Sequence, residues 1–169
     1  MNPRLLFRCA CAALLLLPGC AHMGGQKPEA MKDMNTFCVT MFENHSTQPS
    51  VGMLMTTAVT DALQRDGTYR LVPASQADFL LSGSVTHLSR SSLLTDPDDS
   101  YLSREVGVEV HVTYKVLDRR TGKVVLERSV TGTGSYFTDA GVVQTSLESA
   151  LSYATRLAAD DITNDLTMP

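Results

Sequence analysis

The chain has 169 residues, of which 43% are hydrophobic and 19% are charged. This composition is typical of a globular protein, and the length allows one substantial domain rather than two. Lys and Arg number 14 against 18 Asp and Glu, which gives a net charge of −4. A chain without a basic excess is not expected to bind nucleic acid.

Residues 1–19 are predicted to be a secretory signal. Two arginines precede an apolar run over residues 9–17, which is too short for a retained membrane span. The Leu-Pro-Gly-Cys segment that ends at Cys20 resembles the bacterial lipobox, whose cysteine is acylated, for example with palmitate, and becomes the first mature residue. Pro18 departs from that pattern, and plain secretion is the alternative. The lipobox resemblance, with Ala21 rather than aspartate after the cysteine, implies an outer-membrane anchor facing the periplasm.

The mature chain is expected to consist of a lipidated cysteine with a flexible tether over residues 20–35 and one domain over residues 36–169. Without the signal, 150 residues remain, with 12 basic and 18 acidic side chains and a net charge of −6. Cys38 is then the one cysteine inside the domain. It lies in an apolar run and is predicted to be a small buried thiol.

The first half of the domain is predicted to contain two strands and a helix. Apolar residues recur at helical spacing over residues 51–66, and Gly67 follows as a C-terminal stop. Strands are predicted before and after this helix, with Gly83 inside the second one, and residues 69–72 look extended. A long polar connection follows. The predicted strands and the connection span residues 36–42, 77–88 and 91–103.

A long hairpin over residues 105–136 is the strongest signal. From Val106 to Val116 every second residue is valine or tyrosine, and the residues between them are mostly polar. This alternation predicts a strand with one buried and one wetter face. Residues 118–123 supply a polar turn that contains a glycine, and Val124, Leu126 and Val130 resume the alternation on the return strand.

A closing helix is predicted after a loop over residues 137–144. Thr145 and Glu148 have capping-box spacing. The apolar stripe of this helix is expected to dock on the valine face of the hairpin. The order β-α-β-β-β-α predicts an α+β fold, in which two helices pack on one face of a four-stranded mixed sheet. The stripe consists of Leu147, Ala150, Leu151, Ala154, Leu157, Ala158, Ile162 and Leu166.

Motifs for catalysis or metal binding are absent from the sequence, so neither an enzyme nor a resident cofactor is predicted. The four histidines lack metal-ligand spacing. His87 and His111 are expected to be neighbours on adjacent strands, but a zinc site there lacks a third ligand. The aspartates of residues 96–99 resemble a calcium loop, yet Tyr101 stands where such a loop needs glycine. A solvated turn is therefore predicted.

Taken together, several segments make the chain similar to the lipopolysaccharide-assembly lipoprotein family LptE, also called rare lipoprotein B. Phe-Glu-Asn and Ala-Asp-x-x-Leu-x-Gly pieces also occur in other envelope lipoproteins, including activators of penicillin-binding proteins. The uninterrupted hairpin that leads to a terminal helix favours LptE. The segments are Cys20, Phe42-Glu43-Asn44, Leu63-Gln64-Arg65-Asp66-Gly67, Ala77-Asp78, Leu81-Ser82-Gly83, the hairpin and Asp161-Ile162-Thr163-Asn164-Asp165-Leu166.

The resemblance implies an outer-membrane lipoprotein that plugs the LptD barrel, assists its assembly and binds lipopolysaccharide on its way to the cell surface. The alternative is an envelope regulator that docks on a periplasmic partner such as a penicillin-binding protein. Because the mature chain is acidic and lipid A is anionic, binding needs a local basic cluster. Arg90 and Arg104, predicted to flank the base of the 91–103 connection, are the candidate ligand residues. The cluster Arg119, Arg120 and Lys123 at the hairpin tip is the second candidate, with a plain solvated turn as its other interpretation.

Overall fold

A computed structural model describes residues 27–33, 35–95, 103–138 and 143–168. The predicted signal, Cys20 and the aspartates of residues 96–99 lie outside the described residues. The described chain forms a 3₁₀ turn η1 (Glu29–Met31), six strands and two long helices. The strands are β1 (Thr36–Val39), β2 (Glu43–Asn44), β3 (Arg70–Leu71), β4 (Phe79–Thr95), β5 (Ser103–Asp118) and β6 (Val124–Phe137), and the helices are α2 (Val51–Asp66) and α3 (Val143–Thr167).

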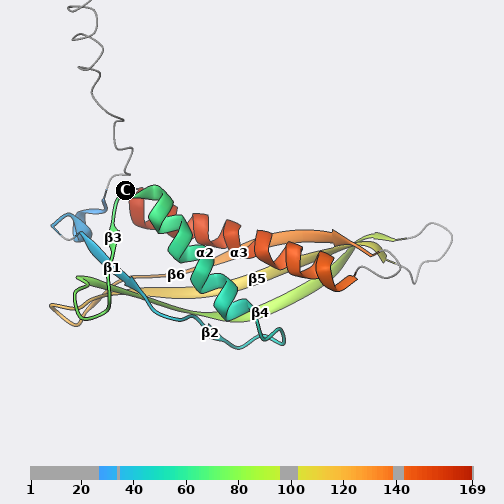
Figure 1. Ribbon diagram of the computed structural model, residues 1–169, viewed down its shortest axis with the longest axis horizontal. Helices are drawn as coiled ribbons and strands as arrows, with labels where there is room; N and C mark the ends of the chain where they lie inside the picture. The colour runs from blue at the N-terminus through green and yellow to red at the C-terminus, as the bar shows by residue number, and fades with distance from the viewer. Residues whose placement is uncertain (1–26, 34, 96–102, 139–142, 169) are drawn as a thin grey trace, which may run out of the picture.

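The molecule is elongated, because β4, β5 and β6 form a long antiparallel ribbon with both helices on one of its faces (Figure 1). The sheet order is β3-β1-β4-β5-β6, and β2 pairs with β4 beyond β1. The pairs β1–β3, β1–β4 and β2–β4 are parallel. The predicted α+β class and mixed sheet are confirmed, but the sheet has six strands rather than four.

The strand count differs in part because the predicted first strand ends at Val39, before Phe42, and the short strand β2 forms just after Phe42, where a loop was expected. The amide of Phe42 donates to the Thr56 hydroxyl of α2 at 2.9 Å instead of joining the sheet. Its ring is buried against Gly83, where a Cβ would come within 2.8 Å of the ring. The other added strand, β3, comes from the segment that looked extended in the sequence, and it is only two residues long.

The helices follow the sequence pattern closely. The predicted bounds of α2 are confirmed, and Gly67 ends it in the left-handed conformation with φ 73°. The last helix begins at Val143, so Thr145 lies inside its first turn rather than at the cap position predicted for it. None of the described helices is long and apolar enough to cross a membrane.

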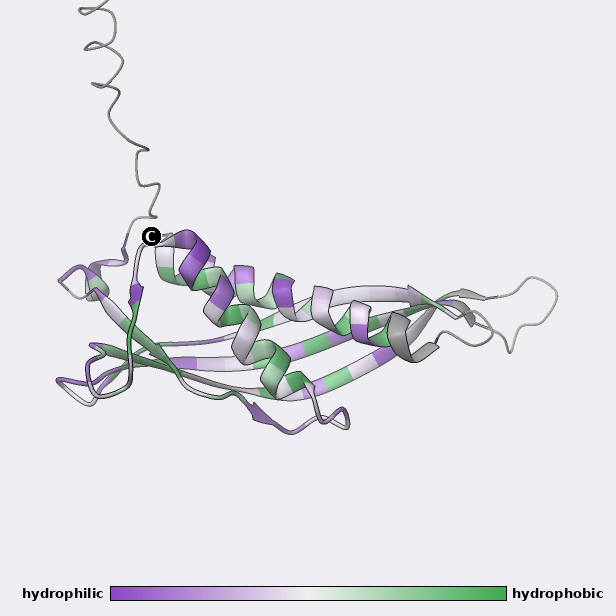
Figure 2. Cartoon of the chain, viewed as in Figure 1, coloured by the Kyte–Doolittle hydropathy of each residue, from purple (hydrophilic) through white to green (hydrophobic). Residues whose placement is uncertain are grey.

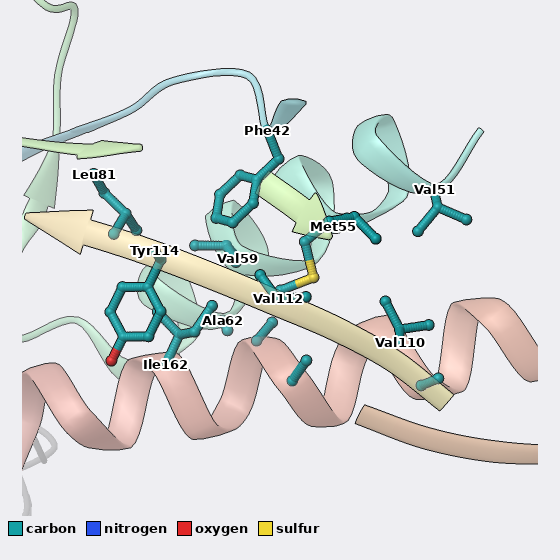
Figure 3. Packing of buried hydrophobic residues seen from close by; sticks show 14 of the residues in the cluster. Phe42, Val51, Met55, Val59, Ala62, Leu81, Val110, Val112, Tyr114 and Ile162 are labelled. Carbon is teal, nitrogen blue, oxygen red and sulfur yellow. The ribbon is translucent and has the colours of Figure 1, made fainter. Parts of the chain in front are cut away.

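The core lies between the helices and the sheet. Figure 3 shows Val110, Val112 and Tyr114 of β5 directed at side chains of the two helices, among them Met55 and Ile162. The alternation along β5 is therefore confirmed, and Figure 2 shows it as alternating hydropathy along the long strands. On the return strand Val124 is exposed instead, because a register shift pairs it with Leu117 and so turns it to the side away from Val116.

Two further expectations are corrected at the N-terminal side of the domain. Residues 27–33 were expected to belong to a flexible tether, but Met31 is buried in the core beside the Tyr69 hydroxyl. Cys38 was expected to be buried, but it is only half-buried, and it is a free thiol.

Candidate functional site

The face of the sheet turned away from the helices, which we call the open face, is polar along most of its length. Paired residues on adjacent strands share a face, so the strand register arranges its side chains in rows. Most members are small, uncharged and able both to donate and to accept hydrogen bonds. The five rows are Ser82–Lys115–Glu127, Ser84–Thr113–Ser129, His87–His111–Thr131, Ser89–Glu109–Thr133 and Ser91–Gly107–Ser135.

Hydrogen bonds connect neighbouring members of these rows. The hydroxyls of Ser84 and Thr113 are 3.0 Å apart, and Ser89 donates to Glu109 at 3.3 Å. Near Lys115 the face is hollowed by about 260 Å³. The open face is thus a polar surface, and a partner that covers it need not be apolar.

The predicted neighbourhood of His87 and His111 is confirmed. Their rings stack with centroids 5.9 Å apart, and Nδ1 of His111 lies 3.0 Å from the Thr131 hydroxyl. Nε2 of His111 is 3.5 Å from a carboxylate oxygen of Glu109. Within the described part of the chain, however, no three His, Cys, Asp or Glu side chains are grouped so as to hold a metal ion.

The sequence suggested that Arg90 ends its strand. In the structure β4 continues past it to Thr95, and β5 already starts at Ser103. The polar connection predicted over residues 91–103 is correspondingly shorter. Arg90 is exposed and is paired with Val108 of β5. Val108 lies four residues after Arg104 on the same strand. At about 3.3 Å per residue, the two backbone positions are about 13 Å apart along the strand direction. The Arg104 side chain lies outside the described part.

The hairpin tip forms the turn that its sequence predicts. Asp118 accepts hydrogen bonds from the amides of Arg120 and Thr121, and Gly122 takes the left-handed conformation. Burial alone would raise the pKa of Asp118, but these bonds and the Thr121 side chain together lower it. Arg119 is held by the domain, since its guanidinium donates to the carbonyl of Ala77 at 3.2 Å. The second basic candidate is therefore reduced to the exposed Arg120 and Lys123.

The motif residues that suggested a family are structural. Asp78 accepts the Thr36 hydroxyl and the amides of Asn35 and Thr36, which joins the starts of β1 and β4. The hydrogen bond from the Thr36 side chain is the main reason why the pKa of Asp78 is lowered. Asn44 organises the loop before α2, because its amide donates to the carbonyls of Gln48 and Pro49.

Sequence reasoning missed a polar link between the end of α3 and the sheet. Asp165 accepts the Tyr114 hydroxyl at 2.6 Å and the Arg128 guanidinium at 2.6 Å. Burial, followed by the bond to Asp165, raises the pKa of Tyr114 well above its usual range. The signal was present only as an aspartate near the end of an apolar stripe, so its partners were not predictable.

The outer side of the helix layer is also polar. A groove of about 590 Å³ runs between α2 and α3. Arg65 of α2 reaches across to Asp160 of α3 with an N···O distance of 3.0 Å. Both broad sides of the molecule therefore present polar groups. The groove is lined by Leu54, Thr57, Ala58, Asp61, Gln64, Arg65, Ser152, Thr155 and Arg156.

Comparison with known protein families gives a match to the model described as "LptE: Lipopolysaccharide-assembly" over residues 34–166, which is most of the chain. The chain belongs to the LptE family. The match covers every described strand and follows α3 as far as Leu166. No curated protein matches the chain significantly.

Solved structures share the fold at low sequence identity. A rare lipoprotein B from Shewanella oneidensis is 19% identical, with a TM-score of 0.52 over 78% of this chain and 92% of that one. A putative lipoprotein from Caulobacter crescentus is 16% identical, with a TM-score of 0.54 over 78% and 87%. The PelC dodecamer subunit from Paraburkholderia phytofirmans is 20% identical, with a TM-score of 0.53 over 85% and 95%. At these identities the likeness concerns the fold alone.

Proposed function

We propose that this LptE-family chain is an outer-membrane lipoprotein that plugs an LptD-like β-barrel, assists assembly of the barrel and binds lipopolysaccharide during its transport to the cell surface. Family membership over residues 34–166 supports a role in lipopolysaccharide assembly. The observation that carries the plug is the polarity of both broad sides, the open face and the outer side of the helices.

A barrel lumen suits such a molecule. Transmembrane barrels are apolar on the outside and polar within, so a plug must present polar groups in most directions. In this chain most large apolar side chains of the ribbon face the helices, and hydroxyl-bearing residues occupy much of the other side; the exposed exceptions among the described residues are Leu93, Val124 and Phe137. A module that docks on one partner would instead concentrate its contact residues in one patch with an apolar centre.

The anchor in this proposal is Cys20. The described chain starts at Lys27, whose ammonium lies over the Tyr69 ring at 5.2 Å, and Tyr69 donates to the Leu166 carbonyl at 3.1 Å. The tether therefore leaves the domain beside the end of α3. Seven residues span at most about 25 Å, so this end of the domain stays close to the membrane. The 16-residue β5 extends about 50 Å along the ribbon, toward the end that carries Arg90 and Arg104.

Arg90 and Arg104 are the residues we propose for contacts with the anionic groups of lipopolysaccharide. Arg90 is exposed and makes no ion pair with the acidic side chains of the described residues. The two backbone positions lie about 13 Å apart along the ribbon, a spacing that suits two separate anionic groups of lipopolysaccharide. Charge reversal at both positions is expected to weaken binding of purified lipopolysaccharide at least tenfold, with circular dichroism unchanged.

The hairpin tip provides a matched control for that experiment. Arg120→Glu with Lys123→Glu removes the same number of positive charges from an exposed turn, while Arg119 keeps its structural bond to Ala77. Binding by this control should stay within about twofold of the unchanged chain. Retained binding in the Arg90 and Arg104 variant, together with loss in the tip variant, would move the site to the tip.

The partner is tested by co-purification from detergent-solubilised outer membranes. The proposal predicts that the intact chain is recovered with a large outer-membrane barrel in a one-to-one complex. Recovery with a penicillin-binding protein and no barrel would favour the envelope-regulator role instead.

A further inference from the structure

One long edge of the sheet has no partner within the described chain. β6 pairs with β5 on one side, without a register shift over the twelve pairs from Leu126 to Phe137. On its other side, no described residue makes a backbone hydrogen bond to β6. A regular row of free N–H and C=O groups is a template for another strand.

Edge strands are usually protected by charges, proline or bulges, and this one is not. From Ser129 to Phe137 the strand contains neither a charged residue nor proline. Arg128, which precedes this stretch, is already bound to Asp165. β4 forms the opposite edge of the sheet beyond Val85, where its pairing with β2 ends. This part of β4 carries Arg90, and its pairing with β5 has three register shifts. The two edges therefore differ, and β6 is the one suited to pairing.

The position of α3 decides what can pair with this edge. The helix lies directly on β6, because a Cβ at Gly134 would come within 2.5 Å of the Ala150 carbonyl oxygen and one at Gly132 would overlap that of Ala154. Two copies joined through β6 would carry both α3 helices on the same face, above strands about 4.8 Å apart. Packed helices need about 8–10 Å between their axes. An antiparallel second copy is therefore disfavoured, and a strand without a helix above it is the occupant that fits.

The outer flank of α3 adds an apolar surface beside this edge. Ser152 and Thr155 face the groove to α2, and helical spacing places Leu157 on the other flank of α3, toward β6. Tyr153 lies between this flank and the outer face of the helix, where it lines a hollow with Ser152 and Arg156. Tyr153 is 57% exposed and Leu157 is half-buried. Apolar side chains of an added strand would pack beneath Leu157, with Tyr153 above them at the rim, while its other side chains would extend the open face.

We propose that the edge of β6 between Ser129 and Phe137 is a strand-addition site for an extended segment of a partner protein with apolar residues at alternate positions. Main-chain hydrogen bonds supply the affinity, and the flank of α3 selects the apolar positions. This inference goes beyond the proposed function, because it assigns one surface and one mode of contact whichever envelope protein supplies the segment.

The test uses the ¹⁵N-labelled full chain in detergent and a synthetic peptide with the sequence of residues 105–116. This probe is chosen because β5 already pairs with β6 in the fold and alternates apolar with polar residues. Amide hydrogen exchange of alternate residues between 129 and 137 is expected to slow at least tenfold when the peptide is added, and exchange in residues 87–93 to stay unchanged. No slowing in β6, or equal slowing along β4, would overturn the proposal.

A matched pair of variants separates edge pairing from unspecific adsorption. Ser135 and Ser91 are both exposed and lie in one row of the open face, on β6 and β4 respectively. Ser135→Lys is expected to weaken peptide binding at least threefold, and Ser91→Lys to leave it unchanged. If Ser135→Lys fails to fold, Thr133→Lys takes its place. Equal effects at the two edges, or a dimer of the whole chain that Ser135→Lys abolishes, would refute strand addition by a partner.

Discussion

Replacing Gly132 with alanine tests the close contact between α3 and β6. The added methyl carbon would lie 2.8 Å from the carbonyl carbon of Ala154, overlap its oxygen, and come within 3.0 Å of the Ala158 Cβ. A helix backbone cannot rotate away as a side chain can, so α3 must move outward by about an ångström, which forfeits a quarter to a half of each affected packing contact. Overpacking of this kind costs about 1–3 kcal/mol, and the upper value is expected here.

The same substitution has a smaller, opposite effect, because alanine loses less chain entropy than glycine in a strand, by about 0.5–1 kcal/mol. The free energy of unfolding should therefore fall by about 2 kcal/mol. Urea titration followed by circular dichroism measures it. Gly134→Ala, with its nearest contact at 2.5 Å, should be less harmful, and the exposed Thr133→Ala should change stability by less than about 0.5 kcal/mol. A stability of Gly132→Ala equal to or above that of the unchanged chain would refute the packing described.

Three further predictions concern the core, the stability of the fold at acidic pH and the lipid anchor. Leu151→Ala should lower the free energy of unfolding by about 2–5 kcal/mol and Val110→Ala by somewhat less, because both side chains are fully buried. Glu109 is exposed, so a similar loss for Glu109→Ala would mean that the strand faces are wrongly assigned. The lowered pKa of Asp78 stabilises the fold above its unfolded pKa of about 3.9, and this contribution disappears as the pH falls through the lower folded value. Asp78→Asn should therefore be less stable than the unchanged chain at pH 7 and lose less free energy of unfolding as the pH falls below about 4; parallel pH curves would contradict this. Cys20→Ser should fold but leave the membrane fraction, since stable attachment needs lipid chains, and its full retention in washed membranes would refute the lipid anchor.

The sequence predicted the elements that rest on a repeated local pattern. The alternation along β5 and the spacing of α2 gave correct faces and, for α2, correct bounds, because one periodicity holds over a dozen or more residues. The early end of β1 and the presence of β2 were not predictable, because Phe42 between them donates its amide to the Thr56 hydroxyl of a distant helix. The extension of β4 past Arg90 was missed as well, since serine-rich residues on a hydrated face resemble a loop in composition.

The candidate site was predicted less well than the fold. The neighbourhood of His87 and His111 followed from strand pairing. The role of Arg119 in the tip and the contact of the two β6 glycines with α3 depend on residues that are distant in the sequence. Gly132 and Gly134 alternate with threonine, a spacing that fits a strand against which a helix packs closely, and the small residues of the α3 stripe were the only other signal.

The most direct test of the plug is the accessibility of both broad sides in native outer membranes. With Cys38 replaced by serine, single cysteines are placed at Thr133 on the open face and at Gln64 on α2, both of which are exposed in the isolated chain. An impermeant maleimide then measures their reactivity in membranes and in the purified chain. Enclosure by a barrel predicts that both positions react at least tenfold more slowly in membranes. Full reactivity at either position, with the chain still bound to its partner, would contradict enclosure and leave a module docked through one face.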